Sequence, residues 1–176
     1  LKAKAMGSFN PKDIGAIGIA YQMHGLVLLG KEGAVLRNSI IWCDSRAVET
    51  GNQAFEALGE EYCLTHLLNS PGNFTASKLA WVKENEPEIY TKIDKVMLPG
   101  DYIAMKLTGD ITTSVSALSE GGFFDFETNS ISKDIINYFG FDQSLFPVVK
   151  PVFSSHGALL ASVAQKLNLK AGIPVT

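Results

Sequence analysis

An apolar run with small residues, at positions 17–20, is followed directly by the polar cluster Gln22-Met23-His24. A short apolar run bounded by Gly15 and by polar residues is typical of a buried strand that ends in polar side chains. In open α/β sheets, ligands bind at the edge where such strands end. The run therefore predicts an α/β fold with a binding site near His24.

A hairpin is expected next, because apolar runs at residues 26–29 and 34–36 flank a polar turn bounded by glycines at residues 30–33. A further apolar run at residues 39–42 leads into Cys-Asp-Ser-Arg at residues 43–46. A second aromatic and charged cluster thus follows a predicted strand. Two polar clusters at strand ends predict one shared pocket.

Helical periodicity and turn residues predict the remaining elements. Asp44 or Ser45 is expected to cap the first helix and Thr75 the third, and Gly109 is expected to stop the fifth. Lys2 and Lys4 are expected at the solvated end of a helix. The predicted helices span residues 45–58, 60–68, 75–86, 87–94, 101–108, 132–139 and 158–167, and the further strands span residues 95–98 and 173–176.

Composition excludes several classes of function. The chain has 176 residues, of which 46% are hydrophobic, and this is enough for one continuous core. The formal net charge of −3, without a run of Lys or Arg, argues against nucleic acid and anionic membranes as partners. No apolar run reaches the roughly 20 residues of a membrane span, and no signal peptide is apparent, so a soluble cytoplasmic protein is expected.

Metal binding is not indicated by the sequence. The two cysteines, Cys43 and Cys63, lack metal-ligand spacing, and free thiols fit a reducing compartment. His66 and His156 are expected to be structural or exposed. The hydroxyl-rich stretch at residues 111–122 is interpreted as helix capping, because no His or Lys at a defined spacing would activate a serine.

Gln-Met-His-Gly at residues 22–25, the hairpin, and Ile-Ile-Trp-Cys-Asp-Ser-Arg at residues 40–46 resemble, in this order, the sugar-binding half of FGGY carbohydrate kinases. Within that family the pattern is most similar to xylulokinases. Residues 73–85 also resemble the family signature, in which a loop residue and then an aromatic or small residue are followed by Lys, an apolar residue, any residue and Trp. Asn73 departs from the residue types expected at the first signature position. The residues that fit are Phe74, Thr75, Lys78, Leu79, Trp81 and Val82.

The resemblance implies a ribonuclease-H-like domain of the actin-like ATPase class, truncated at both ends. Residues 1–176 are expected to form part of the N-terminal, sugar-binding FGGY domain. The first strands and the phosphate-binding turn would precede Leu1, and the catalytic aspartate, the general base, would follow Thr176. A C-terminal nucleotide-binding domain would complete the protein. The chain by itself is expected to contain no catalytic residue, to bind no cofactor and to be inactive.

The resemblance also implies an activity for the intact protein, which is expected to be a homodimer. With ATP and Mg²⁺ it would phosphorylate D-xylulose to D-xylulose 5-phosphate. His24 is expected to exchange a hydrogen bond with a sugar hydroxyl, and Met23 and Trp42 to form walls against C–H faces. Further polar contacts are expected from Asp44, Asn73 and Asp101.

Alternatives follow from the residues themselves. A lone His after a strand is more often structural than catalytic, although the resemblance favours a binding role for His24. Asp101 is equally compatible with a helix cap. Lys78 and Trp81 are interpreted as a solvated charge and a core aromatic on an amphipathic helix. The intact protein could also be a kinase for another sugar or polyol, such as gluconate or ribulose, or a non-catalytic sugar-binding module.

Overall fold

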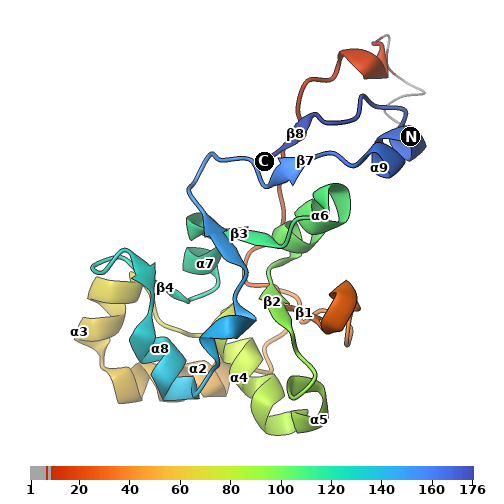
Figure 1. Ribbon diagram of the computed structural model, residues 1–176. Helices are drawn as coiled ribbons and strands as arrows, with labels where there is room; N and C mark the ends of the chain where they lie inside the picture. The colour runs from red at the N-terminus through yellow and green to blue at the C-terminus, as the bar shows by residue number, and fades with distance from the viewer. Residues whose placement is uncertain (1–6, 8) are drawn as a thin grey trace.

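The computed structural model describes Gly7 and residues 9–176, so the expectation for Lys2 and Lys4 lies outside the described residues. Helices and short strands alternate along the chain, which confirms the α/β class (Figure 1). The helices are η1 (Pro11–Asp13), η2 (Lys31–Gly33), α2 (Val48–Leu58), α3 (Glu60–Tyr62), η3 (Cys63–Leu67), α4 (Thr75–Asn85), α5 (Pro87–Tyr90), α6 (Pro99–Thr108), α7 (Val115–Glu120), α8 (Lys133–Phe139), η4 (Gln143–Leu145) and α9 (Ala161–Leu167). The strands are β1 (Val27–Leu29), β2 (Lys95–Met97), β3 (Thr112–Ser114), β4 (Phe124–Asp125), β5 (Ser130–Ile131), β6 (Val148–Lys150), β7 (Gly157–Ala158) and β8 (Pro174–Val175).

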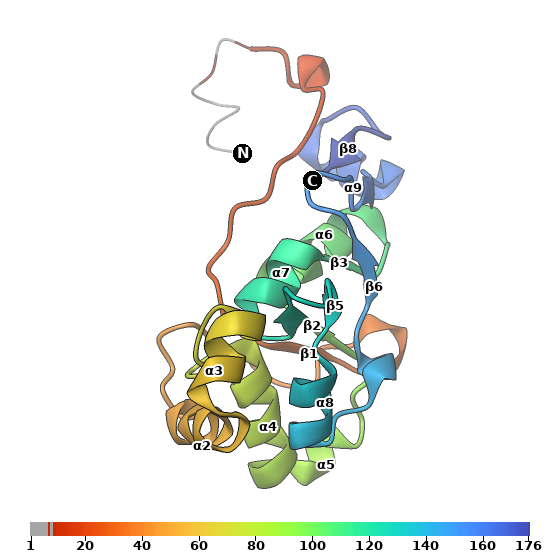
Figure 2. The same cartoon turned by 90° about the vertical axis from the view of Figure 1, so that its left-hand side faces the viewer.

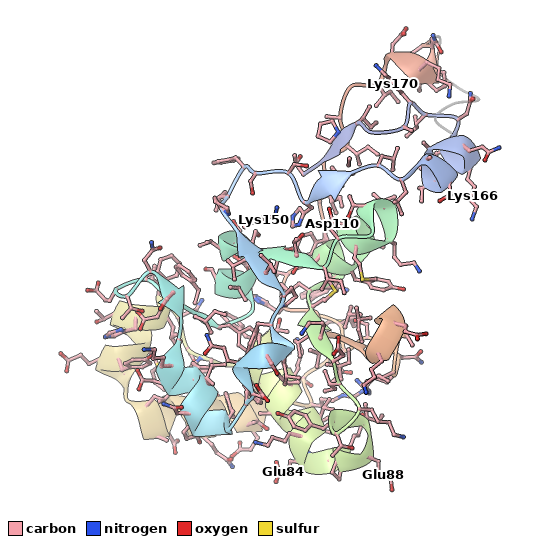
Figure 3. The ribbon with its side chains drawn as sticks, in the orientation of Figure 1. Glu84, Glu88, Asp110, Lys150, Lys166 and Lys170 are labelled. Atoms are coloured by element: carbon pink, nitrogen blue, oxygen red, sulfur yellow. The ribbon has the colours of Figure 1, made fainter. Side chains whose placement is uncertain are left out.

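The strands pair in four ladders among the described residues. β1 lies antiparallel to β2, with Leu28 opposite Val96, and β3 lies parallel to β6. β4 pairs with β5, and β7 with β8, both antiparallel. Figure 1 shows α2 to α5 and α8 gathered at one end, and β7, β8 and α9 at the other. Charged side chains also mark these ends, Glu84 and Glu88 at the α4–α5 end and Lys166 and Lys170 near α9 (Figure 3).

The segment predicted as a buried strand, residues 17–20, is extended but is not buried. It runs as a coil from the end that holds β8 and α9 toward the end that holds α2 to α4 (Figure 2). Ile17 forms a parallel bridge with Val175, and Ile17 and Ile19 donate backbone hydrogen bonds to Pro174 and Thr176. Gly18 and Ala20 are exposed. The prediction of burial is wrong because, among the described residues, this segment pairs along one side only.

The predicted hairpin is confirmed as a single bridge between Leu29 and Val35, closed by a hydrogen bond of 2.8 Å from Gly30 N to the Ala34 carbonyl. The strand predicted at residues 39–42 is wrong except at Ile40, which bridges to Leu26. Trp42 lies in a turn with 58% of its surface exposed.

The main core lies between α4, β1, α8 and the aromatic residues that follow α7. Leu26, Leu28, Leu79, Phe123 and Ile135 are all almost fully buried there. A second cluster, which includes Ala104, Leu159 and Val175, packs α6 against β7, β8 and α9. Burial of the Leu-sized side chains contributes about 1.5–3 kcal/mol each. Ile14, Ile17 and Ile19 of the extended segment that leads to His24 pack against this second cluster.

Two predicted helix caps are wrong. α2 begins at Val48 with Ala47 at the N-cap position and without a side-chain cap, because the Asp44 carboxylate pairs with Arg46 instead. Phe74, not Thr75, occupies the N-cap position of α4, and the Thr75 hydroxyl donates to the Gly25 carbonyl at 3.3 Å. The predicted stop at Gly109 is confirmed, with the left-handed φ of 84° that favours glycine.

Close packing fixes the loop that enters α4. Gly51 of α2 lies against the backbone of Gly72, and an added Cβ at Gly51 would lie 1.7 Å from the Gly72 carbonyl oxygen. Only a residue without a side chain allows this approach. The position of Asn73 is therefore set by the contact between α2 and the loop.

Candidate functional site

A pocket of about 310 Å³ lies beside His24. The segment before β1 contributes Met23 and His24, and the residues around α4 and α7 contribute Phe74, Ser119 and Glu120. The remaining lining residues are Leu67, Leu68, Asn69 and Phe126. Of the predicted site residues, the pocket thus brings together Met23 and His24.

The His24 ring has a fixed orientation. Its Nδ1 lies 2.6 Å from the Glu120 carbonyl oxygen, and the ring stacks on Phe74 with centroids 4.0 Å apart and an interplanar angle of 9°. A carbonyl oxygen only accepts, so Nδ1 carries a proton and donates it. In the neutral ring, Nε2 is then left with a free lone pair. His24 can therefore offer a substrate hydroxyl an acceptor in a defined direction.

The backbone before β1 is also fixed. His24 has a φ of 58°, in the left-handed region. The Tyr21 ring packs against Gly100 at the start of α6, where an added Cβ would lie 2.1 Å from the ring. Burial raises the pKa of Tyr21, and the carboxylates of Asp101 and Glu120 raise it further. Tyr21 thus anchors on α6 the turn that carries Met23 and His24.

Lys78 connects the elements of the site, which contradicts its interpretation as a solvated charge. It is fully buried, and Nζ donates to the carbonyl oxygens of His24 at 2.8 Å and Asn73 at 2.7 Å. Burial lowers the pKa of Lys78 to about 8, although the Asp44 carboxylate opposes this shift. The sequence predicted correctly that Lys78 lies on a helix, but it could not reveal that the acceptors of Lys78 are main-chain oxygens of the site loops.

Trp42, Asp44 and Asn73 form a second group beside this connection. The Asn73 amide nitrogen donates to the carbonyl oxygens of Trp42 at 3.3 Å and Asp44 at 2.7 Å. The Trp42 amide in turn donates to Gln22 Oε1 at 3.2 Å. These contacts join the two polar clusters of the sequence, although none of the three residues lines the pocket beside His24.

The Asp44 carboxylate and the Asn73 side-chain oxygen, which are the two polar groups that this cluster could offer a ligand, differ in their hydrogen bonding. Arg46 donates to both Asp44 carboxylate oxygens, at 2.9 and 2.7 Å, and these hydrogen bonds lower the pKa of Asp44. Arg46 also lies over the ring of Trp81, 4.8 Å from its centroid, and Trp81 packs against the main core as predicted. Asn73 Oδ1 is buried and accepts no hydrogen bond among the described residues.

Asp101 lies apart from the pocket beside His24. It is 2% exposed and lines a second pocket of about 340 Å³ together with Tyr21, His156 and Thr176. Its carboxylate accepts from the Thr113 hydroxyl at 2.7 Å and from the backbone amide of Leu98. Burial raises the pKa of Asp101 to about 6, against the effect of these two hydrogen bonds.

The raised pKa of Asp101 predicts a pH-dependent stability. The folded state binds a proton more tightly than the unfolded state, so the contribution of Asp101 to stability falls as pH rises from about 4 to about 6. We compare the free energy of unfolding of Asp101→Asn with that of the parent protein. The difference, variant minus parent, is expected to increase by on the order of 2 kcal/mol between about pH 4 and about pH 6, and to stay constant at higher pH. Urea unfolding of both proteins from pH 4 to pH 8 measures this difference. A constant difference across the range would contradict the raised pKa.

His66 and His156 have structural contacts, in line with their interpretation from the sequence. His66 Nδ1 lies 3.0 and 3.1 Å from the two Asp125 carboxylate oxygens, and His156 Nδ1 lies 3.0 Å from the Thr112 hydroxyl. Burial and the charge of Lys150 lower the pKa of His156. Asp125, whose carboxylate contacts His66, lies 59 residues further along the chain. No local spacing could therefore predict this contact.

Residues 7 and 9–176 contain no group of three or more His, Cys, Asp or Glu side chains placed to hold a metal ion. Within the same part of the chain, no helix has the length and apolar character needed to cross a bilayer.

Comparison with known proteins identifies the family. The N-terminal domain model of the FGGY family of carbohydrate kinases matches residues 2–176. The chain is 36% identical to the xylulose kinase of Bacillus subtilis (strain 168), over 94% of this chain and 33% of that protein. It is 34% identical to the xylulose kinase of Escherichia coli (strain K12), over 98% of this chain and 35% of that protein. The chain thus spans about a third of the length of these relatives.

A solved structure supports the same assignment. The crystal structure of xylulose kinase from Rhodospirillum rubrum superposes with a TM-score of 0.86 at 28% identity, over 98% of this chain and 36% of that chain. The predicted ribonuclease-H-like fold of the actin-like ATPase class is thereby confirmed. The chain belongs to the FGGY family of carbohydrate kinases and matches the N-terminal domain of that family.

Proposed function

We propose that the intact protein is a xylulose kinase, which transfers the γ-phosphoryl group of ATP to D-xylulose and forms D-xylulose 5-phosphate. The observation that carries this proposal is the pocket beside His24, where an oriented imidazole meets apolar walls. Such a combination suits a sugar, which presents both hydroxyl groups and C–H faces. The identity of more than 30% to two xylulose kinases supports the choice of sugar.

His24 is proposed as the main polar contact with the sugar. Its Nε2 would accept a hydrogen bond from a hydroxyl group, since Nδ1 already donates to the Glu120 carbonyl. Met23, which is 52% exposed, would pack against a C–H face. These contacts orient the hydroxyl that is to be phosphorylated, and orientation is a large part of catalysis in phosphoryl transfer.

Trp42, Asp44 and Asn73 are proposed as further contacts on the adjoining surface, Trp42 as a wall and the other two as polar groups. Trp42 supports this role through its exposed ring, and Asn73 through its unsatisfied Oδ1. For Asp101 we propose the role of a helix cap, because its carboxylate oxygens accept from Thr113 and from the amide of Leu98 at the start of α6.

ATP with Mg²⁺ is the phosphoryl donor that the family implies. The described residues do not fit a metal site, because none of their acidic and histidine side chains form a group of three. We therefore assign no catalytic step to these side chains. We propose that residues 1–176 are part of the N-terminal, sugar-binding domain, and that the general base and a C-terminal nucleotide-binding domain lie elsewhere in a cytoplasmic, homodimeric enzyme. The greater length of the relatives supports this organisation.

A substrate panel tests the proposal. We expect the intact protein to release ADP from MgATP with D-xylulose at a kcat/KM at least about 10-fold higher than with D-ribulose, D-gluconate or glycerol. ADP release without sugar provides the background rate. A preference for another member of the panel would assign a different sugar kinase, and background rates with every sugar would leave a non-catalytic binding module.

A further inference from the structure

The pocket beside His24 has an apolar wall formed by Leu67, Leu68 and Phe126, here called the Leu68 wall. Leu68 is 57% exposed and Phe126 is 39% exposed, so both present hydrocarbon surface to the pocket. These side chains offer no hydrogen bond to a hydroxyl group. They limit the space available to a ligand that His24 holds by its polar groups.

The backbone at Leu68 has an unusual conformation that sets the position of its side chain. The π-helix η3 (Cys63–Leu67) ends there, and Leu68 adopts a φ of 58° and a ψ of 12°. L-residues other than Asn and Asp seldom occupy this left-handed region. Short π-helical turns occur frequently at functional sites. The left-handed backbone at Leu68 is therefore consistent with a functional role of its side chain in the pocket.

Two direct contacts tie this wall together. His66 Nδ1 lies 3.0 Å from Asp125 Oδ1, and the amide of Phe126 donates to the His66 carbonyl at 2.8 Å. His66 and Asp125 thus pair, while their chain neighbours Leu67 and Phe126 line the pocket. The pair fixes the end of η3 relative to the end of β4.

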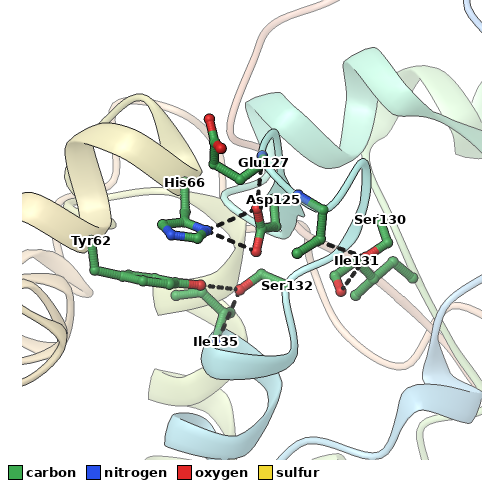
Figure 4. Close-up of polar contacts among 9 residues, drawn as sticks. Tyr62, His66, Asp125, Glu127, Ser130, Ile131, Ser132 and Ile135 are labelled. Carbon is green, nitrogen blue, oxygen red and sulfur yellow. Dashed lines mark hydrogen bonds and ion pairs between the residues drawn. The ribbon is translucent and has the colours of Figure 1, made fainter.

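The surroundings of the pair hold it rigidly (Figure 4). Asp125 also accepts from the amides of Glu127 at 2.9 Å and Thr128 at 3.1 Å. Burial opposes ionisation of Asp125, but the hydrogen bonds from Thr128 and His66 outweigh it and lower the pKa of Asp125. The carboxylate is therefore ionised at neutral pH and able to hold His66.

The aromatic ring beside His66 extends the support to α8. Tyr62 stacks on His66 with centroids 4.5 Å apart, and its hydroxyl lies 2.8 Å from Ser132 Oγ. Ser132 in turn caps α8 by accepting from the amide of Ile135 at 3.1 Å. The imidazole is thus clamped between a buried carboxylate and an anchored ring.

We propose that Leu68 is a specificity-determining residue that limits the length of the sugar accepted beside His24, and that the His66–Asp125 pair positions the Leu68 wall. The inference rests on the proposed function, because it takes the sugar to occupy this pocket. The occupant is a short ketose, and a ketose with one further CHOH group meets the Leu68 side chain.

Replacing Leu68 with glycine in the intact enzyme tests the specificity role. Glycine removes the side chain and suits the left-handed backbone. We expect the ratio of kcat/KM for D-fructose, a ketohexose, to kcat/KM for D-xylulose to rise about 10-fold. Leu64→Ala is the matched control, because Leu64 lies in the π-helix that ends just before Leu68 and is 51% exposed but does not line the pocket. Its ratio should equal that of the parent enzyme.

Replacing His66 with glutamine tests the positioning role. Gln cannot reproduce the ring that stacks on Tyr62 and hydrogen-bonds to Asp125, so the wall loosens. We expect KM for D-xylulose to rise about 3- to 10-fold with kcat nearly unchanged, because the bound sugar loses a wall but keeps its reacting groups. Equal losses in kcat and kcat/KM, or no change in either, would overturn the positioning role.

The outcomes separate this inference from the proposed function. If the parent enzyme does not phosphorylate D-xylulose, the proposed function fails and the inference fails with it. If the parent enzyme is active but the sugar ratio of Leu68→Gly equals that of Leu64→Ala, the inference alone is overturned. Leu68→Asn, which also suits the left-handed region, decides the question if the glycine variant does not fold.

Discussion

Replacing Lys78 with methionine in the intact protein is expected to lower the free energy of unfolding by about 2–4 kcal/mol. The ammonium group donates to the carbonyl oxygens of His24 and Asn73, and both lose this donor when the side chain becomes apolar. Methionine keeps most of the buried stem, so the change isolates the polar contacts. The methionine variant also avoids the free-energy cost of burying a charged ammonium group. This gain offsets part of the loss and limits the expected destabilisation to the upper end of the stated range.

Lys83→Met is the matched control for this change. Lys83 lies one turn and a half further along α4 and also donates to two carbonyl oxygens, those of Phe139 and Gly140, but it is not fully buried. We expect its loss to be smaller than that of Lys78→Met and the KM for D-xylulose to stay unchanged. Urea unfolding and initial rates measure both effects. Equal losses for the two variants would show that Lys78 has no special role at the site.

Replacing His24 with asparagine is expected to lower kcat/KM for D-xylulose by about 10- to 100-fold, which corresponds to about 1–3 kcal/mol of transition-state stabilisation. Asparagine suits the left-handed backbone of His24 and can donate to the Glu120 carbonyl, but its side chain has no group at the position of Nε2. The loss therefore reports on the contact with the sugar rather than on the backbone.

His156→Asn is the control for this prediction, because His156 lines the second pocket, beside Asp101. We expect its kcat/KM to match that of the parent enzyme. A loss in His156→Asn together with normal activity in His24→Asn would place the sugar in the second pocket.

Local patterns were enough to predict the elements whose signal is contained in a few residues. The spacing of Leu79 and Val82 predicted α4, and the run before Pro99 predicted β2, both confirmed within one or two residues. The family resemblance rested on short motifs around His24, Trp42 and Lys78, and it is confirmed by the family match.

The features that the sequence could not predict depend on partners far along the chain. β1 pairs mainly with β2, nearly 70 residues away in register at Leu28 and Val96, rather than with its hairpin neighbour. Lys78 is buried because carbonyl oxygens of two loops converge on it. Every residue has a main-chain carbonyl, so residue types do not indicate which carbonyl oxygens will accept from Lys78.

The grouping of the site residues also depended on distant contacts. A shared sheet edge suggested one pocket for Met23, His24, Trp42, Asp44, Asn73 and Asp101. The structure instead separates Asp101, which α6 carries into a second pocket, from His24. Leu68, which directly follows η3, and Glu120 of α7 help to complete the pocket beside His24, and no motif indicated them.

The proposed function requires that the pocket beside His24 holds the sugar. A crystal structure of the intact protein with D-xylulose tests this most directly. We expect the sugar to lie between His24, Met23 and the Leu68 wall, with one hydroxyl group within hydrogen-bonding distance of His24 Nε2. A sugar bound instead beside Asp101 and His156, with no contact to His24, would contradict it.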